Sequence, residues 1–260
     1  MEDKRFSIVR ANDLFIGPRR GHLGTAVLEK NLLPRYTYEK FQSDPVTSGK
    51  AGGAATGATG DENMMGLGSN MFEYHILGAG QTILAPSLVA TGLLVSLDLT
   101  DNMGCEITQG ILARSKQAFV IGTDEFYFKL KFSIADISGT DDCAMGFRLA
   151  EDYQAAIDGY QDMAILNVIS GAIKIETEAG GGGTTTTDTT NTWIDGATHT
   201  LEVYVDLAGA VTYKIDGADP TVVAAYSFTD ALTVIPFFHF LHATTLPGQI
   251  ILQEWECGLQ

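Results

Sequence analysis

The chain has 260 residues and a formal net charge of −16, with 45% hydrophobic and 18% charged residues. This composition indicates a globular protein, because disordered chains are poorer in apolar residues and richer in charge. The charge is unevenly distributed: residues 1–50 hold nine basic and six acidic residues, whereas residues 51–260 hold seven basic and twenty-six acidic ones. An acidic body repels phosphates, so we expect no nucleic-acid binding.

The chain shows no targeting or membrane-spanning segment. Its first residues, Met1–Ser7, lack the apolar stretch of a signal peptide, and no apolar run approaches the ~18 residues of a membrane-spanning helix. We therefore expect a soluble protein made in a cytoplasm, without a membrane partner. Cys105, Cys143 and Cys257 are too few and too scattered for a disulfide framework. Buried free thiols are expected, and one disulfide plus an odd thiol is the alternative.

The N-terminal region divides into two segments of different character. Residues 1–47 show weak hydrophobic periodicity and no core of their own, which predicts an extended N-terminal arm that needs a partner surface. Residues 48–70 are rich in Gly, Ala, Ser and Thr, a composition typical of a flexible linker because small residues bury little surface. Residues 71–260 form the predicted body.

The body has a hydrophobic period of two residues. Phe126–Ile134, Leu201–Leu207 and Val211–Ile215 each alternate apolar side chains with polar or charged ones, as strands do when one face is in water. Turn dipeptides such as Ser170-Gly171 and Asp216-Gly217 separate the strands. Further strands are predicted at 72–77, 92–99, 105–108, 118–121, 143–149, 162–169, 172–178, 222–228, 234–242 and 249–257. Many short antiparallel strands predict an all-β protein, a β-sandwich or jelly roll.

Residues 180–192, GGGGTTTTDTTNT, form a low-complexity segment. Gly favours mobile turns, and Thr favours an extended backbone. We interpret the segment as an exposed hairpin tip, and the alternative is a contact loop to a neighbouring subunit or a ligand.

One pair of carboxylates has the spacing of a catalytic site. Glu254 and Glu256 flank Trp255, and on a strand they share one face, at a separation used by glycosidase pairs. Two glutamates on a solvated face are the preferred interpretation, because exposed acidic residues are common. No nucleophile, phosphate-binding or dinucleotide signature is present. We therefore predict that the protein is not an enzyme.

Metal sites have little support in the sequence. His239 and His242 lie three apart, so on a strand they point to opposite faces and do not share an ion. The runs Thr140–Asp142 and Asp61–Asn63 offer oxygen ligands for calcium, but neither has the order of an EF-hand loop. We expect no cofactor, with calcium as a weak alternative.

The stretch Thr192–Gly217 resembles a known fold family. It contains Trp-Ile-Asp-Gly, then His-x-Leu-x-Val-x-Val-Asp, then Gly-x-Val-x-Tyr-x-Ile-Asp-Gly. This pattern is similar to the concanavalin A-like, laminin-G-like jelly rolls, in which the last two segments form a hairpin. The resemblance covers about residues 71–260 and implies the fold more than the function, because that fold hosts lectins, glycosidases and structural modules.

The arrangement of arm, linker and sandwich, together with segments 119–127 and 145–148, resembles virion proteins of tailed bacteriophages. The chain lacks the acidic catalytic cluster of sandwich glycosidases and the metal-ligand loop of legume-type lectins. The resemblance implies a structural virion protein on the capsid surface, made in the host cytoplasm: a capsid decoration or cement protein. Its partner would be the major capsid protein, and a capsid lattice would suit a trimer or another homo-oligomer.

In this hypothesis the arm docks on the capsid and the acidic sandwich faces outward. The apolar arm residues would bury surface on a capsid subunit, and the arginines would pair with capsid carboxylates. The predicted partner-binding residues are Arg5, Phe6, Ile8, Arg10, Leu14, Phe15, Ile16, Arg19 and Arg20.

The alternative hypothesis is a carbohydrate-binding, lectin-like module on a virion or cell surface. Trp193, Tyr204 or Trp255 would then provide a platform on which a sugar ring stacks. Core packing is the competing interpretation for each aromatic residue, and it is preferred for the two tryptophans.

Overall fold

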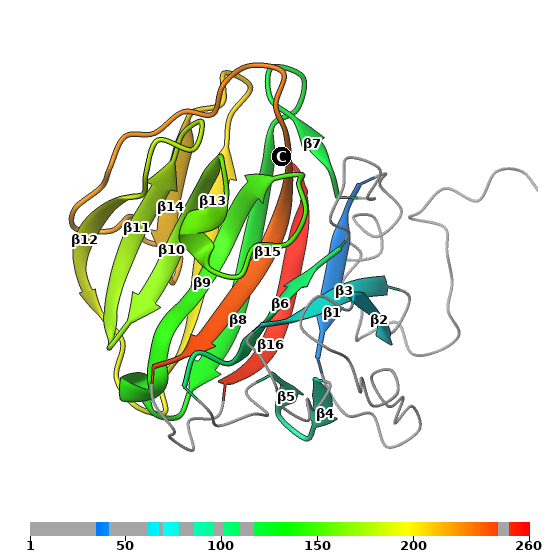
Figure 1. Cartoon of the computed structure of the whole chain (residues 1–260), viewed down its shortest axis with the longest axis vertical. Coiled ribbons are helices and arrows are strands. Elements are labelled where there is room, and N and C mark those ends of the chain that lie inside the picture. Colours follow the sequence, from blue (N-terminus) through cyan, green and yellow to red (C-terminus); the bar gives the residue numbers. More distant parts are fainter. Residues whose placement is uncertain are drawn as a thin grey trace, which may run out of the picture.

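The computed structural model describes residues 35–41, 62–67, 70–77, 86–95, 101–109, 117–243 and 250–260. Within these residues the protein is a sandwich of two antiparallel β-sheets, which we call sheet A and sheet B (Figure 1). The predicted all-β sandwich is therefore confirmed. Two short 3₁₀ helices accompany the strands, η2 (Ile137–Gly139) and η3 (Ile157–Gly159).

Sheet A has seven strands in the order β14-β13-β8-β16-β5-β4, and β1 also pairs with β16. Its strands are β1 (Thr37–Lys40), β4 (Ser87–Val89), β5 (Gly92–Leu94), β8 (Phe126–Ile134), β13 (Thr198–Val205), β14 (Val211–Ile215) and β16 (Ile250–Leu259). One edge of β16 is covered by β8, and its other edge is shared by β5 and β1.

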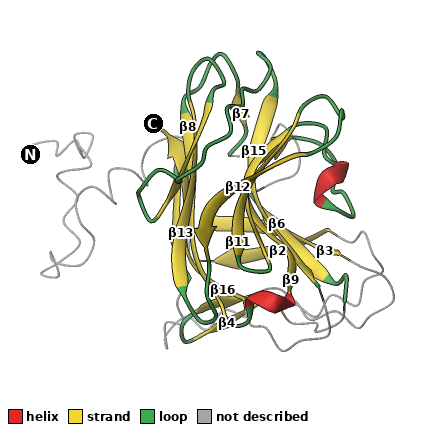
Figure 2. Cartoon of the chain, turned by 90° about the vertical axis from the view of Figure 1, so that its left-hand side faces the viewer, coloured by secondary structure: helices red, strands yellow, loops and turns green. Residues whose placement is uncertain are grey.

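Sheet B has nine strands in the order β12-β11-β10-β9-β15-β6-β3-β2, and the short β7 pairs with β15. Its strands are β2 (Glu62–Leu67), β3 (Asn70–Leu77), β6 (Gly104–Thr108), β7 (Phe119–Val120), β9 (Thr140–Leu149), β10 (Met163–Ile169), β11 (Ala172–Glu178), β12 (Thr185–Thr192) and β15 (Thr233–His242). Figure 2 shows the two sheets edge on, with β8 and β13 on one side and β9 and β3 on the other.

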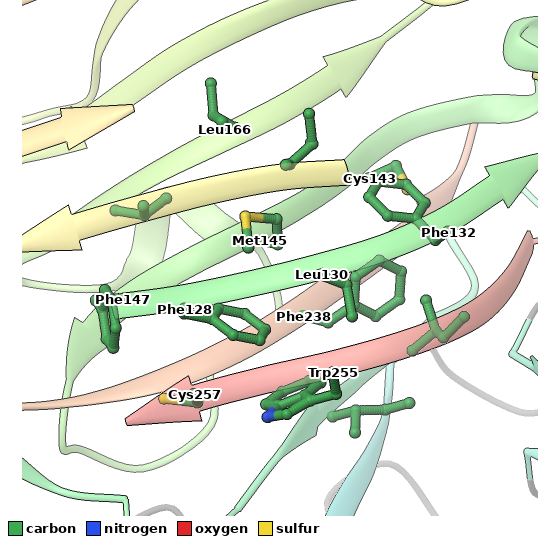
Figure 3. Close-up of a cluster of buried hydrophobic side chains, with 14 of the residues drawn as sticks. Phe128, Leu130, Phe132, Cys143, Met145, Phe147, Leu166, Phe238, Trp255 and Cys257 are labelled. Carbon is green, nitrogen blue, oxygen red and sulfur yellow. The ribbon is translucent and has the colours of Figure 1, made fainter. Parts of the chain in front are cut away.

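The core fills the space between the sheets, and its side chains come from alternate positions of each strand (Figure 3). Trp255 of β16 is fully buried and contacts Phe128 of β8 at 4.3 Å and Phe72 of β3 at 5.3 Å between ring centroids. Aromatic contacts of this kind hold the sheets together, because each ring buries a large apolar area and offset or edge-on rings attract each other.

Several strands predicted from the period of two are confirmed with their faces. β8 buries Phe126, Phe128 and the other apolar positions, whereas Lys129 and Lys131 lie at partly exposed positions. The hairpin of β13 and β14 inferred from the family resemblance is present, with Val205 opposite Val211. The Ser170-Gly171 dipeptide joins β10 to β11 with φ values of 48° and 84°, as a two-residue hairpin turn requires.

Two predictions about local structure are corrected. Residues 185–192 are not part of a hairpin tip but form β12, because the β-favouring threonines pair with β11. Residues 222–228 do not form a strand: Val222 N–H donates to Thr189 O in sheet B, and Phe228 N–H donates to Gly209 O beside sheet A. This segment therefore bridges the edges of both sheets and cannot follow one of them.

Parts of the predicted arm and linker contribute strands to the sandwich. β1 lies within residues 1–47, and β2 lies within residues 48–70. Tyr36, Thr37 and Phe41 are buried, and the Phe41 ring packs 5.7 Å from Phe72. Residues 1–34 lie outside the described part of the chain.

The three cysteines agree with the preferred prediction of buried free thiols. Cys105, Cys143 and Cys257 are buried free thiols. Among the described residues there is no helix with the length and hydrophobicity that crossing a bilayer requires.

The packing of Phe41 predicts that β1 is an integral strand of the sandwich. Phe41→Ala should lower the free energy of unfolding by about 3 kcal/mol, because it removes a buried aromatic side chain and leaves a cavity beside Phe72. Lys40→Ala, at the adjacent exposed position, should change it by less than about 0.5 kcal/mol. Urea unfolding measures both, and equal effects would show that β1 does not pack as described.

Candidate functional site

The outer face of sheet A, which is turned away from sheet B, carries an ordered set of polar and aromatic side chains that we call the polar face. Residues that lie opposite each other in an antiparallel ladder share one face. In this way the register aligns one row across five strands, from Lys214 through Glu202, Lys129 and Glu256 to Tyr38.

Two further rows lie on either side of this one. The first runs from Thr212 through Tyr204 and Tyr127 to Gly258, where the missing side chain leaves room for the Tyr36 ring.

The second row runs from Lys131 through Glu254 to Lys40. The polar face is formed by the three rows together, from β14 at one edge to β1 at the other.

Tyrosine hydroxyls on the polar face donate hydrogen bonds to glutamates. Tyr127 donates to Glu256 at 2.7 Å, Tyr38 donates to Glu254 at 3.4 Å, and Tyr204 donates to Glu202. Burial, followed by the charge of Glu254, raises the pKa of Tyr38 to about 12. Tyr38 therefore keeps its proton at neutral pH.

A hollow of about 330 Å³ lies at the β14 end of the polar face, within the size range of small-molecule sites. It is lined by Tyr204, Asp206, Ala210, Thr212, Lys214 and Gln260. The lining combines one partly exposed aromatic ring with a carboxylate, an ammonium, a hydroxyl and an amide. Such a set of groups can contact both an apolar face and hydroxyl groups of a small molecule.

The turn between β13 and β14 holds one wall of the hollow in place. Ala210 N–H donates to the Asp206 carboxylate at 2.8 Å, and Gly209 N–H donates to Asp206 O at 2.9 Å. Gly209 has φ of 83°, and a Cβ there would lie 2.7 Å from Phe228 O, so this position requires glycine. The C-terminal Gln260 closes another wall, since its amide donates to Phe126 O and Val205 O at 3.2 Å.

The three aromatic residues predicted as stacking platforms differ in how far they are exposed to solvent. Trp193 and Trp255 are buried in the core, as the preferred interpretation held. Tyr204 alone of the three is partly exposed, and it lines the hollow. Its ring lies 5.8 Å from Tyr127, with Lys129 at 5.7 Å and Lys214 at 5.9 Å from its centroid.

Glu254 and Glu256 share the outer face of sheet A, as the sequence predicted, but their surroundings differ from those of a glycosidase pair. Glu254 forms an ion pair with Lys131 at 3.2 Å, and Glu256 accepts hydrogen bonds from Tyr127 and Tyr36. Trp255 points into the core and cannot stack on a sugar beside them. The pair therefore serves the hydrogen-bond network of the polar face.

A second cluster of titratable residues lies on the outer face of sheet B and was missed by the sequence analysis. Glu106 of β6, Arg148 of β9 and His239 of β15 are all fully buried. Arg148 Nε donates to Glu106 at 2.8 Å, Tyr160 donates to the same carboxylate, and His239 Nδ1 lies 3.3 Å from it. We call these four residues the buried cluster.

A loop covers the buried cluster. Tyr160 and Ile157 pack on Phe237 and Met163, and η3 lies on this side of sheet B in Figure 2. The guanidinium of Arg148 is 4.5 Å from the Tyr160 ring centroid and also donates to the carbonyl of Glu151 in the loop. The cluster thus fixes the loop to the sheet instead of facing solvent.

The electrostatics of the buried cluster depend on its ion pair. Burial by itself would raise the pKa of Glu106, but the charges and hydrogen bonds of Arg148, His239 and Tyr160 hold that pKa below its usual value. His239 Nε2 has no hydrogen-bond partner within the described residues.

The sequence held one signal for the buried cluster: three polar residues interrupt apolar strands. Their pairing is set by strand order, which the sequence did not reveal.

The remaining candidate sites are the two histidines of β15 and the acidic runs considered for calcium. His239 and His242 lie on opposite faces of β15, as expected: His239 faces Glu106, and His242 packs on Phe240 of the core at 4.6 Å. Among the described residues no group of three or more His, Cys, Asp or Glu side chains is placed to hold a metal ion. Asp142 accepts a hydrogen bond from Asn167 at 2.7 Å.

Some predicted residues lie outside the part of the chain that the structure describes. These are Asp61 of the calcium alternative and all nine partner-binding residues, namely Arg5, Phe6, Ile8, Arg10, Leu14, Phe15, Ile16, Arg19 and Arg20.

Comparison with solved structures finds several proteins with remote similarity to this chain. The carbohydrate recognition domain of Emp47p is similar over 85% of this chain and 97% of that domain, with 12% identity and a TM-score of 0.47. Galectin LEC-6 of Caenorhabditis elegans covers 54% of this chain and 89% of its own, with 12% identity and a TM-score of 0.35.

An alginate lyase from Alteromonas sp. 272 is also similar, over 72% of this chain and 94% of its own, with 10% identity and a TM-score of 0.43. No protein-family model matches the chain, and no curated protein matches its sequence. The function of this chain therefore has to be argued from its own residues.

The buried cluster predicts a strong dependence of stability on its ion pair. Arg148→Ala should lower the free energy of unfolding by about 3–5 kcal/mol, because it removes the guanidinium that is paired with the buried Glu106 carboxylate. Lys131→Ala breaks a partly exposed ion pair and should cost no more than about 1 kcal/mol. Denaturant unfolding of the two variants distinguishes the cases, and similar losses would contradict a dry interior around Glu106.

The lowered pKa of Glu106 predicts a stability difference that depends on pH. A carboxyl group with a lowered folded-state pKa stabilises the fold above its unfolded-state pKa of about 4.3, and this contribution disappears as pH falls through the folded-state value. The stability gap between wild type and Glu106→Gln should therefore be widest near neutral pH and should narrow in acid. Glu39 and Glu176, whose pKa values are raised by burial, contribute with the opposite sign in both proteins and cancel in this difference.

Proposed function

We propose that the protein is a carbohydrate-binding module whose ligand occupies the hollow at Tyr204. The observation that supports this is the placement of a partly exposed tyrosine ring in a concave site with Asp206, Thr212 and Lys214. An aromatic ring can cover the apolar face of a sugar, and the surrounding groups can bind its hydroxyls.

The groups in the hollow offer both directions of hydrogen bonding. Asp206 is exposed and can accept from a hydroxyl, whereas Lys214 donates and has no ion-pair partner among the described residues. Thr212 both donates and accepts. A ligand with several hydroxyls satisfies all three side chains, and a purely apolar ligand would leave charged groups without water or partners.

The virion role remains a separate prediction, because the residues on which it depends lie outside the described part of the chain. A capsid decoration protein displayed outward could also carry a carbohydrate-binding site, so the two hypotheses are compatible. The packing of Tyr36 and Phe41 defines where a truncation should end. Removing residues 1–34 tests docking on the major capsid protein without removing β1.

Tyr204→Ala tests the proposed function. On glycan arrays and in calorimetry it should weaken glycan binding about tenfold or more, which corresponds to the ~1.4 kcal/mol expected of one aromatic contact. Tyr204→Phe keeps the ring and should retain most of the affinity.

Leu207→Ala, at an exposed position that does not line the hollow, is the matched control and should bind as wild type does. Absence of glycan binding by the wild type, or wild-type affinity in Tyr204→Ala, would refute the proposal.

A further inference from the structure

The polar face extends well beyond the hollow. Tyr204 lies on β13 next to the hollow, and the second partly exposed tyrosine of the face, Tyr38, lies on β1. β8 and β16 separate these two strands. At the usual spacing of neighbouring strands, the backbones of β13 and β1 are therefore about 14 Å apart across the sheet. One small ligand in the hollow cannot reach both tyrosines.

The side chains between the two tyrosines alternate in hydrogen-bonding character. The row that crosses the sheet carries Glu202, Lys129 and Glu256 in turn, at the strand spacing. Glu202 is buried, and Lys129 and Glu256 are partly exposed, so a donor and an acceptor follow each other at the surface. A polymer whose units each present hydroxyls matches such a row, because a hydroxyl both donates and accepts.

The polar face and the hollow together hold four lysines and four carboxylates, although the whole chain has a formal charge of −16. The four lysines are Lys40, Lys129, Lys131 and Lys214, and the four carboxylates are Asp206, Glu202, Glu254 and Glu256. Lys129 pairs with Glu202, and Lys131 pairs with Glu254, both at 3.2 Å.

This balance selects against charged ligands. An anionic polymer would find no excess of positive charge on the face and hollow taken together, and a basic partner would find no excess of negative charge there. An uncharged, hydroxyl-rich chain keeps the internal ion pairs intact and still satisfies the exposed donors and acceptors.

We propose that the polar face binds a neutral, linear oligosaccharide that has one end in the hollow at Tyr204 and crosses β8 and β16 to reach Tyr38. This inference rests on the proposed function and adds the length, direction and charge of the ligand. The N-terminal strand β1 then supplies the far end of the binding surface.

The test compares a length series on wild type, Tyr38→Ala and Tyr38→Phe. The probes are neutral glucose, mannose and galactose oligomers from monosaccharide to hexasaccharide, with uronate oligomers as the charged comparison, and calorimetry measures affinity. Wild-type affinity should rise with length. Tyr38→Ala should lose about tenfold for the longest oligomers and nothing for the monosaccharide, and Tyr38→Phe should bind as wild type does.

The outcomes separate this inference from the proposed function. Tyr204-dependent binding with equal affinity for short and long oligomers, or with no effect of Tyr38→Ala, would overturn the extended surface and leave the hollow as a binding site. Tighter binding of uronate oligomers that weakens with salt would overturn the neutral ligand. No binding of any probe by the wild type would reject both proposals. Thermal unfolding of Tyr38→Ala and Tyr38→Phe confirms that each variant is folded.

Discussion

The constraint on which the structure depends is the two-residue period of the central strands of sheet A. In β8 every second side chain enters the core, and in β16 the same alternation holds on either side of a register shift between Leu252 and Glu254. Phe128 and Trp255 pack together in this core. The intervening side chains are then forced onto the outer face, in register with their neighbours. The polar face is thus the necessary counterpart of the core, and a one-residue slip of β16 would destroy both at once.

Much of the fold could be predicted from the sequence for this reason. The alternation in Phe126–Ile134 indicated both the strand and its buried face, and the dipeptide Ser170-Gly171 marked a tight turn. Strand order could not be predicted in the same way. Nothing in the local pattern says that β16, at the end of the chain, lies between β8 and the N-terminal strand β1. Long-range pairing of this kind is decided by packing across the whole sandwich.

The candidate sites, like the fold, could be predicted from the sequence only in part. Tyr204 could be named in advance as a possible platform, because it is a large aromatic at a solvent-facing position of an alternating strand. The hollow beside it could not be predicted, since it requires the C-terminal Gln260 to lie against Val205. The buried cluster was missed because Glu106, Arg148 and His239 look like isolated polar interruptions until three neighbouring strands bring them together.

The buried cluster and the polar face use charge in opposite ways. In the cluster a carboxylate and a guanidinium are fully buried, and their interaction holds the covering loop on the sheet. Replacing both residues by apolar ones need not lower the stability of the fold, because burying two charges is itself costly. On the polar face the ion pairs are partly exposed and contribute little to stability. Stability does not explain their regular arrangement, and recognition of an external ligand is the role that we propose for it. This proposal also involves the N-terminal region of the chain. β1 follows residues 1–34 in the chain, and in our proposal it forms one end of the binding surface on the sandwich.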